Sequence, residues 1–329
     1  MTRALIFEPS YLRIKSRIDS ISGIEMTVMT PDRKFLIGER EVDIKEVPPE
    51  IGWLNFDLFQ NRAIGGYIGA LLGSPVLKWI QSGAAGFDNP VFAEFVKKGA
   101  RLTTSNAQSV AMAEYVLATV LDHIQRGPER KKAQTERRWD RIAFREVMNS
   151  RWLIVGFGAI GRETAKRARA FGAHITGVRR SVGSDEHADK MISPDELLSQ
   201  LPTSDVVVLS LPLSKQTESL VDANFLAAMK TDSVLVNVGR GGLVDEDALL
   251  KALDEGPPQF AILDVFRNEP LPADSAFWSH KRVALTAHAS ANGSGLVARG
   301  DDLFLENLCR FVKNEPLINE ANPRDVQGG

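Results

Sequence analysis

Cysteine is nearly absent from the 329-residue sequence, where Cys309 stands alone. One thiol can form neither an internal disulfide nor a cysteine-rich metal site, so we predict no bound metal and a reducing compartment, the cytoplasm. Long apolar runs are also missing: runs such as 206–209 have the length of a strand, not the ~18 residues of a membrane span. The apolar run 4–7 stops at Glu8 and Pro9, too early for the core of a secretory signal.

Neither sign of charge dominates the composition. The 40 Lys and Arg residues nearly balance the 42 Asp and Glu residues, which leaves a net charge of −2. This balance predicts neither nucleic acid nor an anionic membrane as a partner. Hydrophobic residues at 43% and charged residues at 25% are ordinary for a globular protein, and the length suits about two domains.

Short apolar runs alternate with amphipathic stretches between residues 150 and 287. The predicted strands are 152–155, 174–178, 205–209, 233–237, 260–264 and 283–286. The predicted helices between them are 160–171, 194–201, 223–229 and 245–253. Because parallel strands need such crossover helices, this region is predicted to form one doubly wound parallel sheet.

A second, weaker alternation precedes that region. Its predicted strands are 5–7, 26–29, 76–80 and 101–103, with a helix at 90–98. After the small and polar residues of 289–295, apolar residues at helical spacing predict a helix from 296 to 312. We expect this helix to return to the first part of the chain, with a helix at 109–125 as the other crossing. The central region would then be an insertion.

A glycine-rich motif, G-x-G-x-x-G, directly follows the strand at 152–155 and begins a helix. Gly156 permits a tight turn, Gly158 lets the backbone approach a pyrophosphate, and Gly161 allows close packing of helix and strand. Free N–H groups at the helix start attract the anion. A turn without a ligand, or a methyltransferase loop, is the alternative. The residues predicted to hold the pyrophosphate are Gly156, Gly158, Ala159, Ile160 and Gly161.

The end of the next predicted strand indicates which dinucleotide is bound. An NAD site has Asp or Glu there, which accepts a hydrogen bond from the ribose 2′-hydroxyl. Here Arg179, Arg180 and Ser181 occupy that position. Two guanidinium groups and a hydroxyl bind a 2′-phosphate that a carboxylate would repel. We therefore predict NADPH as the preferred cofactor, with NADH accepted at lower affinity. Exposed arginines without this role are the alternative.

These patterns together predict two doubly wound parallel-sheet α/β domains. Residues 106–288 are expected to form a Rossmann nucleotide domain. Residues 1–105 with 289–329 are expected to form a flavodoxin-like substrate domain, into which the nucleotide domain is inserted.

Three later polar residues each follow a predicted strand, at the edge where open α/β sheets bind ligands. They are Arg240 in V-N-V-G-R-G-G, Glu269 in D-V-F-R-N-E-P and His288 in T-A-H. A lone His is more often structural, and a lone Arg is more often a surface charge. The hypothesis of a catalytic site therefore depends on the joint occurrence of all three.

With these motifs in this order, the sequence resembles the D-2-hydroxyacid dehydrogenase family from about residue 81 to residue 319. The arginine pair resembles that of the family's NADPH-dependent glyoxylate and hydroxypyruvate reductases. The resemblance implies that Arg240 binds the substrate carboxylate and carbonyl, that His288 is the acid–base catalyst, and that Glu269 supports the imidazolium. The chemistry needs such groups, because hydride addition to a 2-keto carbon builds negative charge on oxygen.

Further ligand contacts are implied by the same resemblance. The small-residue loop 82–88 is similar to the family's substrate loop, in which the N–H groups of Ala85 and Gly86 bind the carboxylate. Asp264 is similar to the residue that hydrogen-bonds the nicotinamide amide. The other positions implied to contact the cofactor are Leu211, Pro212, Val238 and Gly239.

The sequence thus predicts an oxidoreductase that transfers a hydride from NADPH to a small 2-keto acid, of the glyoxylate or hydroxypyruvate type, giving a D-2-hydroxy acid. The segment 126–151 is rich in Arg and Lys and also contains acidic residues, which favours a solvated helix or a subunit-contact arm over a nucleic-acid contact. The resemblance implies that region 109–150, with Trp139 and Phe144, pairs two nucleotide domains in a homodimer. A dinucleotide-sensing corepressor on the same fold is the alternative function.

Overall fold

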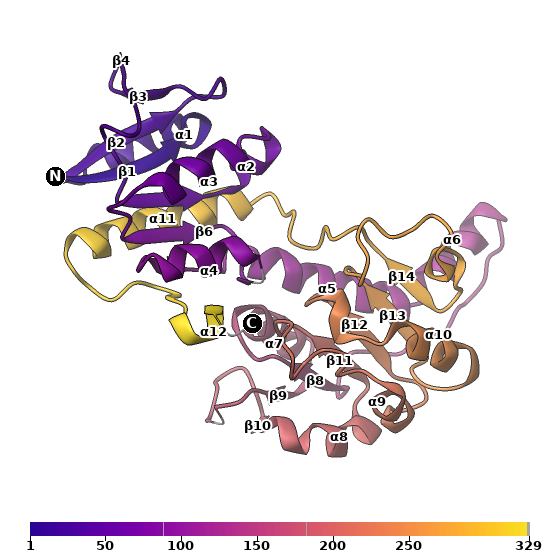
Figure 1. Cartoon of the computed structure of the whole chain (residues 1–329). Coiled ribbons are helices and arrows are strands. Elements are labelled where there is room, and N and C mark those ends of the chain that lie inside the picture. The colour runs from indigo at the N-terminus through magenta and orange to yellow at the C-terminus, as the bar shows by residue number, and fades with distance from the viewer. Residues whose placement is uncertain (88, 182, 328–329) are drawn as a thin grey trace. The chain divides into compact units, whose positions relative to one another are not determined.

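The chain divides into two units, and each is a sheet with helices on its faces (Figure 1). The structure is a computed structural model that describes residues 1–87, 89–181 and 183–327. Unit 1 contains Met1–Ala107 and Ser294–Gly329, and unit 2 contains Gln108–Gly293. The breaks therefore come after residues 107 and 293, where the sequence predicts them after 105 and 288.

Unit 1 contains a seven-stranded sheet, within its described residues, in the order β4-β3-β2-β1-β5-β6-β7. The strands are β1 (Thr2–Phe7), β2 (Ile24–Met29), β3 (Phe35–Ile37), β4 (Arg40–Glu41), β5 (Ile51–Leu54), β6 (Trp79–Ser82) and β7 (Arg101–Thr103). The helices are α1 (Glu8–Ile18), α2 (Phe56–Gln60), α3 (Ile64–Gly73), α4 (Pro90–Lys97), α11 (Leu296–Val312) and α12 (Pro323–Gln327). The closing helix α11 thus belongs to the same unit as the N-terminal strands.

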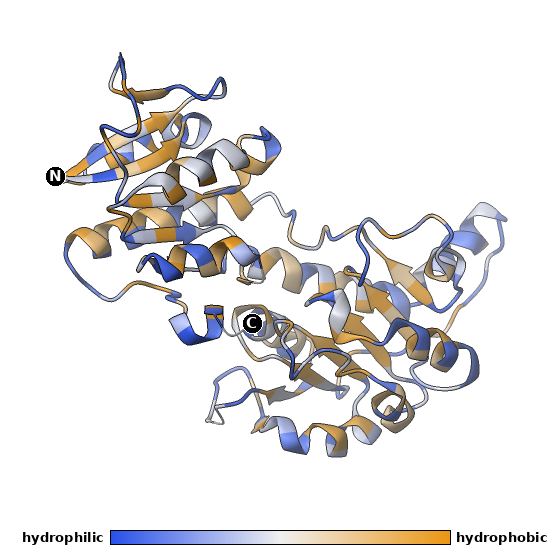
Figure 2. Cartoon of the chain, viewed as in Figure 1, coloured by the Kyte–Doolittle hydropathy of each residue, from blue (hydrophilic) through white to orange (hydrophobic). Residues whose placement is uncertain are grey.

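Side chains of alternating direction along β1 explain the layers of unit 1. Ala4 and Ile6 pack in a core with residues of α1 and α11, whereas Leu5 and Phe7 pack in a second core with residues of α2, α3 and α4. Both faces of the sheet are covered, so all four side chains are fully buried. A strand covered on both faces carries a continuous apolar run, as Figure 2 shows for the central strands.

One edge of this sheet departs from the predicted parallel arrangement. β2, β1, β5, β6 and β7 are parallel, but β3 pairs antiparallel with β2 and β4 pairs antiparallel with β3. A tight turn with Gly38 at a φ of 62° joins β3 to β4, and glycine adopts this φ at little cost. The strand predicted at 76–80 begins at Trp79 instead, because residues 75 and 76 form a turn and pairing with β5 starts at Ile51.

Unit 2 contains a seven-stranded sheet, again counted over its described residues, in which every strand pair is parallel. The order is β10-β9-β8-β11-β12-β13-β14. The strands are β8 (Arg151–Val155), β9 (His174–Val178), β10 (Lys190–Ile192), β11 (Val206–Leu209), β12 (Val234–Asn237), β13 (Phe260–Leu263) and β14 (Val283–Leu285). All six strands predicted for this region are present, and the short edge strand β10 was not predicted.

The helices of unit 2 cover the two faces of its sheet. Residues of α5 (Ser109–Ile124) and α7 (Ala159–Ala170) pack in one core, and residues of α8 (Leu197–Gln200), α9 (Ala223–Ala228) and α10 (Glu246–Glu255) pack in the other. The helix predicted at 194–201 is present as α8 between two 3₁₀ turns, η1 (Pro194–Glu196) and η2 (Leu201–Thr203). The remaining elements are α6 (Gly127–Thr135), η3 (Gly241–Leu243) and η4 (Ala276–Ser279). No helix of the described residues is long and apolar enough to cross a bilayer.

Candidate active site

Three backbone segments meet closely at the carboxyl ends of β8, β11 and β12. Gly156 has a φ of 97°, and a Cβ there would lie 2.7 Å from the nitrogen of Leu211. A Cβ on Gly239 would lie 2.9 Å from the carbonyl oxygen of Leu211. These glycines therefore let the strand ends approach, and they bring together three of the residues predicted to contact the cofactor. Two others flank them: Val238 is buried in the core and Pro212 is exposed.

The first turn of α7 presents a row of free N–H groups. Within the described residues, the N–H groups of Gly158, Ala159, Ile160 and Gly161 donate to no protein oxygen. A Cβ on Gly161 would lie 2.5 Å from the Gly156 carbonyl oxygen, whereas a Cβ on Gly158 would meet no protein atom within 4 Å. The glycine spacing thus packs the helix against the strand and leaves open space beside unpaired donors. This arrangement fits a dinucleotide pyrophosphate.

The arginine pair after β9 divides between two roles. Arg179 donates from Nε to the Ser181 carbonyl oxygen at 2.7 Å and from Nη2 to the Gly183 carbonyl oxygen at 3.2 Å, and its Nη1 lies 3.8 Å from Asp185 Oδ2. Arg180 is exposed and, among the described residues, makes no hydrogen bond or ion pair. Arg179 therefore holds the turn that follows β9, and Arg180 remains available to an anion.

Asp185 adds a negative charge beside this arginine pair. Burial raises the pKa of its carboxyl, but hydrogen bonds from the His187 N–H and from Arg162, together with the charge of Arg179, outweigh that effect and lower the pKa. Arg162 Nε donates to Asp185 at 2.8 Å. The Asp185 carboxylate thus pairs with Arg162 and lies near Arg179. Among these three arginines, Arg180 is the one without a nearby carboxylate.

His288 and Glu269 come together although they follow different strands. His288 Nδ1 lies 2.8 Å from Glu269 Oε2, and the other oxygen of Glu269 accepts from the Phe266 N–H at 2.9 Å. The carboxylate fixes the tautomer with a proton on Nδ1, so that Nε2 is the ring nitrogen left for a ligand. The His288 side chain is 51% exposed, and the ring is therefore accessible.

Arg240 lies on the neighbouring strand end. The buried Asn237, the last residue of β12, shapes the turn: its Nδ2 donates to the Arg240 carbonyl oxygen at 2.9 Å, and its Oδ1 accepts from the Gly239 N–H at 3.0 Å. A Cβ on Gly241 would overlap the Phe266 carbonyl group. Since β12, β13 and β14 are adjacent, Arg240, Glu269 and His288 follow three neighbouring strands at one edge of the sheet.

A buried carboxylate anchors the loop that carries His288. Asp264 is fully buried, and its oxygens accept from the Thr286 hydroxyl at 2.6 Å, the Ala289 N–H at 2.8 Å, and both the N–H and hydroxyl of Ser290. Its carbonyl oxygen accepts from the His288 N–H at 2.8 Å. These bonds hold His288 at a φ of 50°, in the left-handed region that residues other than glycine adopt uncommonly. The nicotinamide contact of Asp264 stays a prediction.

The loop predicted to bind a carboxylate lies in unit 1, after β6. Within the described residues, the N–H groups of Ala85 and Gly86 donate to no protein oxygen, so two donors are unpaired. The start of the loop is fixed, because the Gly83 N–H donates to the Leu54 carbonyl oxygen at 2.6 Å and the Ala84 N–H donates to Ser82 Oγ at 3.0 Å. Asp88, the last residue of this predicted loop, lies outside the described residues.

Two positioning residues were missed by the sequence reasoning, namely Asn237 and Ser290. Asn237 gives a signal in the sequence, because a buried polar residue that ends an apolar strand needs a hydrogen-bonding partner in the following turn. Ser290 gives none, because its partner Asp264 is distant in the sequence and only the fold brings the two together.

We predict that Asp264→Ala lowers the free energy of unfolding by about 3 kcal/mol or more, because four donor groups lose a buried acceptor. Urea unfolding followed by circular dichroism measures the change. The matched control is Asp245→Ala, which removes an acceptor of the Ala248 N–H at the start of α10 and should cost only about 1 kcal/mol. Equal losses in the two variants would contradict the anchoring role of Asp264.

Comparisons of the sequence with known proteins agree on one family. The family model described as D-isomer specific 2-hydroxyacid dehydrogenase, NAD binding domain, matches residues 117–290. The glyoxylate reductase of Korarchaeum cryptofilum (strain OPF8) is 32% identical over 265 residues, which cover 77% of this chain and 79% of that protein. The D-3-phosphoglycerate dehydrogenase of Bacillus subtilis (strain 168) is 31% identical over 250 residues, 75% of this chain and 47% of that protein.

Solved structures share the fold of this chain. A D-isomer specific 2-hydroxyacid dehydrogenase from Xanthobacter autotrophicus Py2, in complex with NADPH and MES, is 26% identical with a TM-score of 0.80 and covers 99% of this chain and 100% of its own. An NADPH-dependent glyoxylate/hydroxypyruvate reductase from Sinorhizobium meliloti, in complex with NADP and sulfate, is 24% identical with a TM-score of 0.76 over 99% and 100% of the two chains, and it shows the fold alone. The predicted fold of two parallel-sheet α/β domains is confirmed, and the chain belongs to the D-isomer specific 2-hydroxyacid dehydrogenase family.

Proposed function

We propose that this protein is an NADPH-dependent reductase of small 2-keto acids, of the glyoxylate or hydroxypyruvate type, that forms D-2-hydroxy acids. The observation that carries the proposal is the bond between His288 Nδ1 and Glu269 Oε2, with Arg240 on the adjacent strand end. Unit 2 is proposed as the nucleotide domain and unit 1 as the substrate domain. The glyoxylate reductases among the relatives support the substrate class.

Each proposed catalytic residue has a task that its contacts suit. Arg240 binds the substrate carboxylate and carbonyl oxygen, because its planar guanidinium matches both acceptors. His288 Nε2 gives a proton to the carbonyl oxygen as the oxygen gains charge. Glu269 keeps the proton on Nδ1 and stabilises the ring while it is charged. The N–H groups of Ala85 and Gly86 are proposed as further donors to a substrate carboxylate.

NADPH, when bound, supplies the hydride that adds to the 2-keto carbon. The free N–H groups of residues 158–161 are proposed to hold its pyrophosphate, and Arg180 with Ser181 its 2′-phosphate. Leu211, Pro212, Val238 and Gly239 line the adjoining strand ends. Their proposed role is to bound the rest of the cofactor.

We expect wild-type protein to oxidise NADPH in the presence of glyoxylate or hydroxypyruvate, and we expect His288→Gln to remove at least about 99% of this turnover. Absorbance at the NADPH band measures both. Reduction should decline as the pH rises, because it needs the protonated ring, and oxidation of the hydroxy acid should decline as the pH falls. Glu269→Gln should also lower turnover, because the negative charge that stabilises the charged ring is lost.

His280→Gln is the matched control for this experiment. His280 also faces a carboxylate, with Nε2 3.3 Å from Asp254 Oδ1, but it precedes β14 and so lies away from the carboxyl ends of the strands. This variant should retain wild-type turnover. Near-normal turnover by His288→Gln would refute the acid–base assignment. Tight NADPH binding without turnover of any keto acid would instead favour the dinucleotide-sensing alternative.

Cofactor choice is expected to depend mainly on Arg180. We predict that Arg179→Ala with Arg180→Ala raises the KM for NADPH about tenfold more than the KM for NADH, because contacts with a 2′-phosphate are lost. Most of this effect should come from Arg180→Ala alone, since Arg179 already donates to two carbonyl oxygens. Arg324→Ala, on the exposed helix α12, is the control. Equal losses with both cofactors would show that the pair does not contact the 2′-phosphate.

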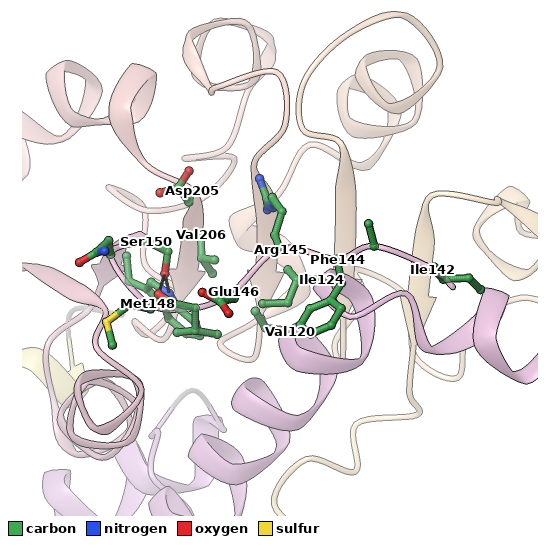
Figure 3. A pocket seen from close by; sticks show the side chains of 14 residues that line it. Val120, Ile124, Ile142, Phe144, Arg145, Glu146, Met148, Ser150, Asp205 and Val206 are labelled. Carbon is green, nitrogen blue, oxygen red and sulfur yellow. Dashed lines mark hydrogen bonds between the residues drawn. The ribbon is translucent and has the colours of Figure 1, made fainter. Parts of the chain in front are cut away.

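We propose that the protein is a homodimer and that the segment 126–151, which follows α5, contributes to the interface. A cavity of about 710 Å³ lies between α5, the segment 142–150 and the start of β11 (Figure 3). Figure 3 shows Ile124, Phe144 and Ile142 toward one end of it and Met148 toward the other. Trp139 is 94% exposed, and Phe144 and Met148 are also exposed. Apolar side chains gathered in this way suit burial against a second copy.

Multi-angle light scattering at micromolar concentration should therefore give twice the mass of the chain. The variant Phe144→Asp should shift the mass toward that of a monomer, because a carboxylate is costly to bury in an apolar contact. Leu12→Asp, an equally drastic change at an exposed apolar residue of α1, should leave the dimer intact. A monomeric wild-type protein would refute the proposal.

A further inference from the structure

Arg267 connects two of the loops at the carboxyl ends of the strands of unit 2. It follows β13, two residues before Glu269, and its side chain reaches the loop that follows β12. Its Nε donates to the Val244 carbonyl oxygen at 2.9 Å, and its Nη2 lies 3.5 Å from the Gly242 carbonyl oxygen. Both oxygens belong to the residues that come directly after Arg240. The loop that carries Glu269 therefore holds the loop that carries Arg240.

The backbones of the same two loops are also in contact. A Cβ on Gly241 would lie 1.9 Å from the Phe266 carbonyl carbon and 2.4 Å from the Arg267 nitrogen, so no side chain fits between the two backbones. The Arg267 N–H donates to Oε1 of Glu246, the first residue of α10, at 2.7 Å. These contacts fix the backbone from which the Arg267 side chain extends.

The guanidinium of Arg267 also binds the loop that follows β11. Its Nη2 donates to the hydroxyl oxygen of Ser219. The Ser219 N–H donates to the Gly242 carbonyl oxygen at 2.8 Å, and the Val221 N–H donates to the Leu243 carbonyl oxygen at 2.9 Å. Segment 219–221 therefore runs beside the residues that follow Arg240. A planar cation with five N–H donors can hold oxygens of two loops at once.

The backbone of Arg240 depends on the short turn η3 that comes after it. The Leu243 N–H donates to the Arg240 carbonyl oxygen at 3.2 Å, and the Val244 N–H donates to the Gly241 carbonyl oxygen at 3.1 Å. Two of the three residues of η3 are glycines, which lose more conformational freedom on ordering than other residues do. Such a turn needs a restraint from outside, and Arg267 supplies one at the far end of the turn, on Val244.

We infer that Arg267 is a positioning residue for Arg240. Its guanidinium holds the glycine-containing turn after Arg240 and thereby keeps the Arg240 side chain where it binds the carboxylate of a 2-keto acid. This inference rests on the proposed function and deepens it, because it assigns a residue that controls substrate affinity without touching the substrate.

The pair of His288 and Glu269 does not depend on the side chain of Arg267. Glu269 accepts from the Phe266 N–H and pairs with His288 Nδ1, and neither bond involves the guanidinium. Loss of the guanidinium should therefore weaken substrate binding and leave the pH dependence of proton transfer unchanged.

The test uses Arg267→Met, which keeps the length of the side chain and removes its donors. Arg267 is exposed, so the replacement opens no cavity in the core. The KM for glyoxylate should rise about tenfold, because a displaced Arg240 binds the carboxylate less well. The inhibition constant of oxamate, an unreactive amide analogue of a 2-keto acid, should rise by a similar factor.

Two other quantities should stay near their wild-type values in Arg267→Met. The KM for NADPH should change less than about threefold, and reduction should decline over the same pH range as in the wild type. Neither KM nor an inhibition constant depends on the amount of folded enzyme. A purely structural loss would therefore lower the rate and leave the glyoxylate KM and the oxamate constant unchanged.

Arg267→Lys tests whether the guanidinium fork is needed. A lysine ammonium can donate to Val244 or to Ser219, but its compact charge cannot hold both loops in one fixed geometry. The glyoxylate KM of Arg267→Lys should therefore lie between the values of the wild type and Arg267→Met.

Arg282→Met is the matched control. Arg282 also donates from its side chain to backbone carbonyl oxygens, to Gln259 at 2.7 Å, to Gly256 at 2.8 Å, and to Leu253 and Pro258. It directly precedes β14 and so lies at the opposite edge of the sheet. This variant should have a lower Tm but a wild-type KM for glyoxylate and a wild-type oxamate constant.

The possible failures can be told apart. If the wild type reduces glyoxylate and Arg267→Met leaves its KM and the oxamate constant unchanged, the inference is wrong and the proposed function stands. An equal rise of both constants in Arg282→Met would also overturn the inference, because the effect would then follow stability alone. Reduction of no keto acid by the wild-type protein would overturn the proposed function and the inference with it.

Discussion

The candidate site depends on the hydrogen bonds that the buried carboxylate of Asp264 accepts. Asp264 accepts from four donor groups of residues 286–290, and its own backbone is bonded on both sides, to Asn237 and to His288. A loop of small residues would otherwise be free to relax His288 out of the left-handed region. The hydrogen bonds to Asp264 therefore fix the position of the loop that carries the imidazole ring. Glu269, which accepts a hydrogen bond from the Phe266 N–H, determines the tautomer of the ring.

A parallel sheet explains why such distant residues can act as one group. One edge of the sheet is formed by the carboxyl ends of its parallel strands, among them β8, β11, β12, β13 and β14. Side chains that follow these strands therefore lie at that edge, whatever the length of the intervening helices. Glycines allow the strand ends to approach one another closely, because Gly156 and Gly239 both lie against the backbone of Leu211. Along this edge, a row of N–H groups at the start of α7 that are unpaired among the described residues follows β8, Arg240 follows β12 two strands away, and the His–Glu pair follows β13 and β14.

Arginines in this protein differ more by their partners than by their positions. Arg179 donates to backbone carbonyls, Arg13 is satisfied by two aspartates, and Arg180 is exposed without a partner among the described residues. A guanidinium whose charge is already balanced by internal carboxylates attracts a ligand anion less strongly than one without such partners. Counting the cations near a site therefore overstates the attraction of that site for phosphate.

The sequence by itself predicted the fold class, the glycine loop, and the strands of unit 2 except the edge strand β10, and it proposed Arg240, Glu269 and His288 as site residues. It could do so because apolar periodicity reports burial, and because parallel strands bring their ends together by geometry alone. Only the tertiary structure decided the antiparallel edge of β3 and β4, the start of β6 at Trp79 and the anchoring of His288 by Asp264. Each depends on which of several nearby acceptors or strands a group meets, and that choice is made by packing between segments that are far apart in the chain.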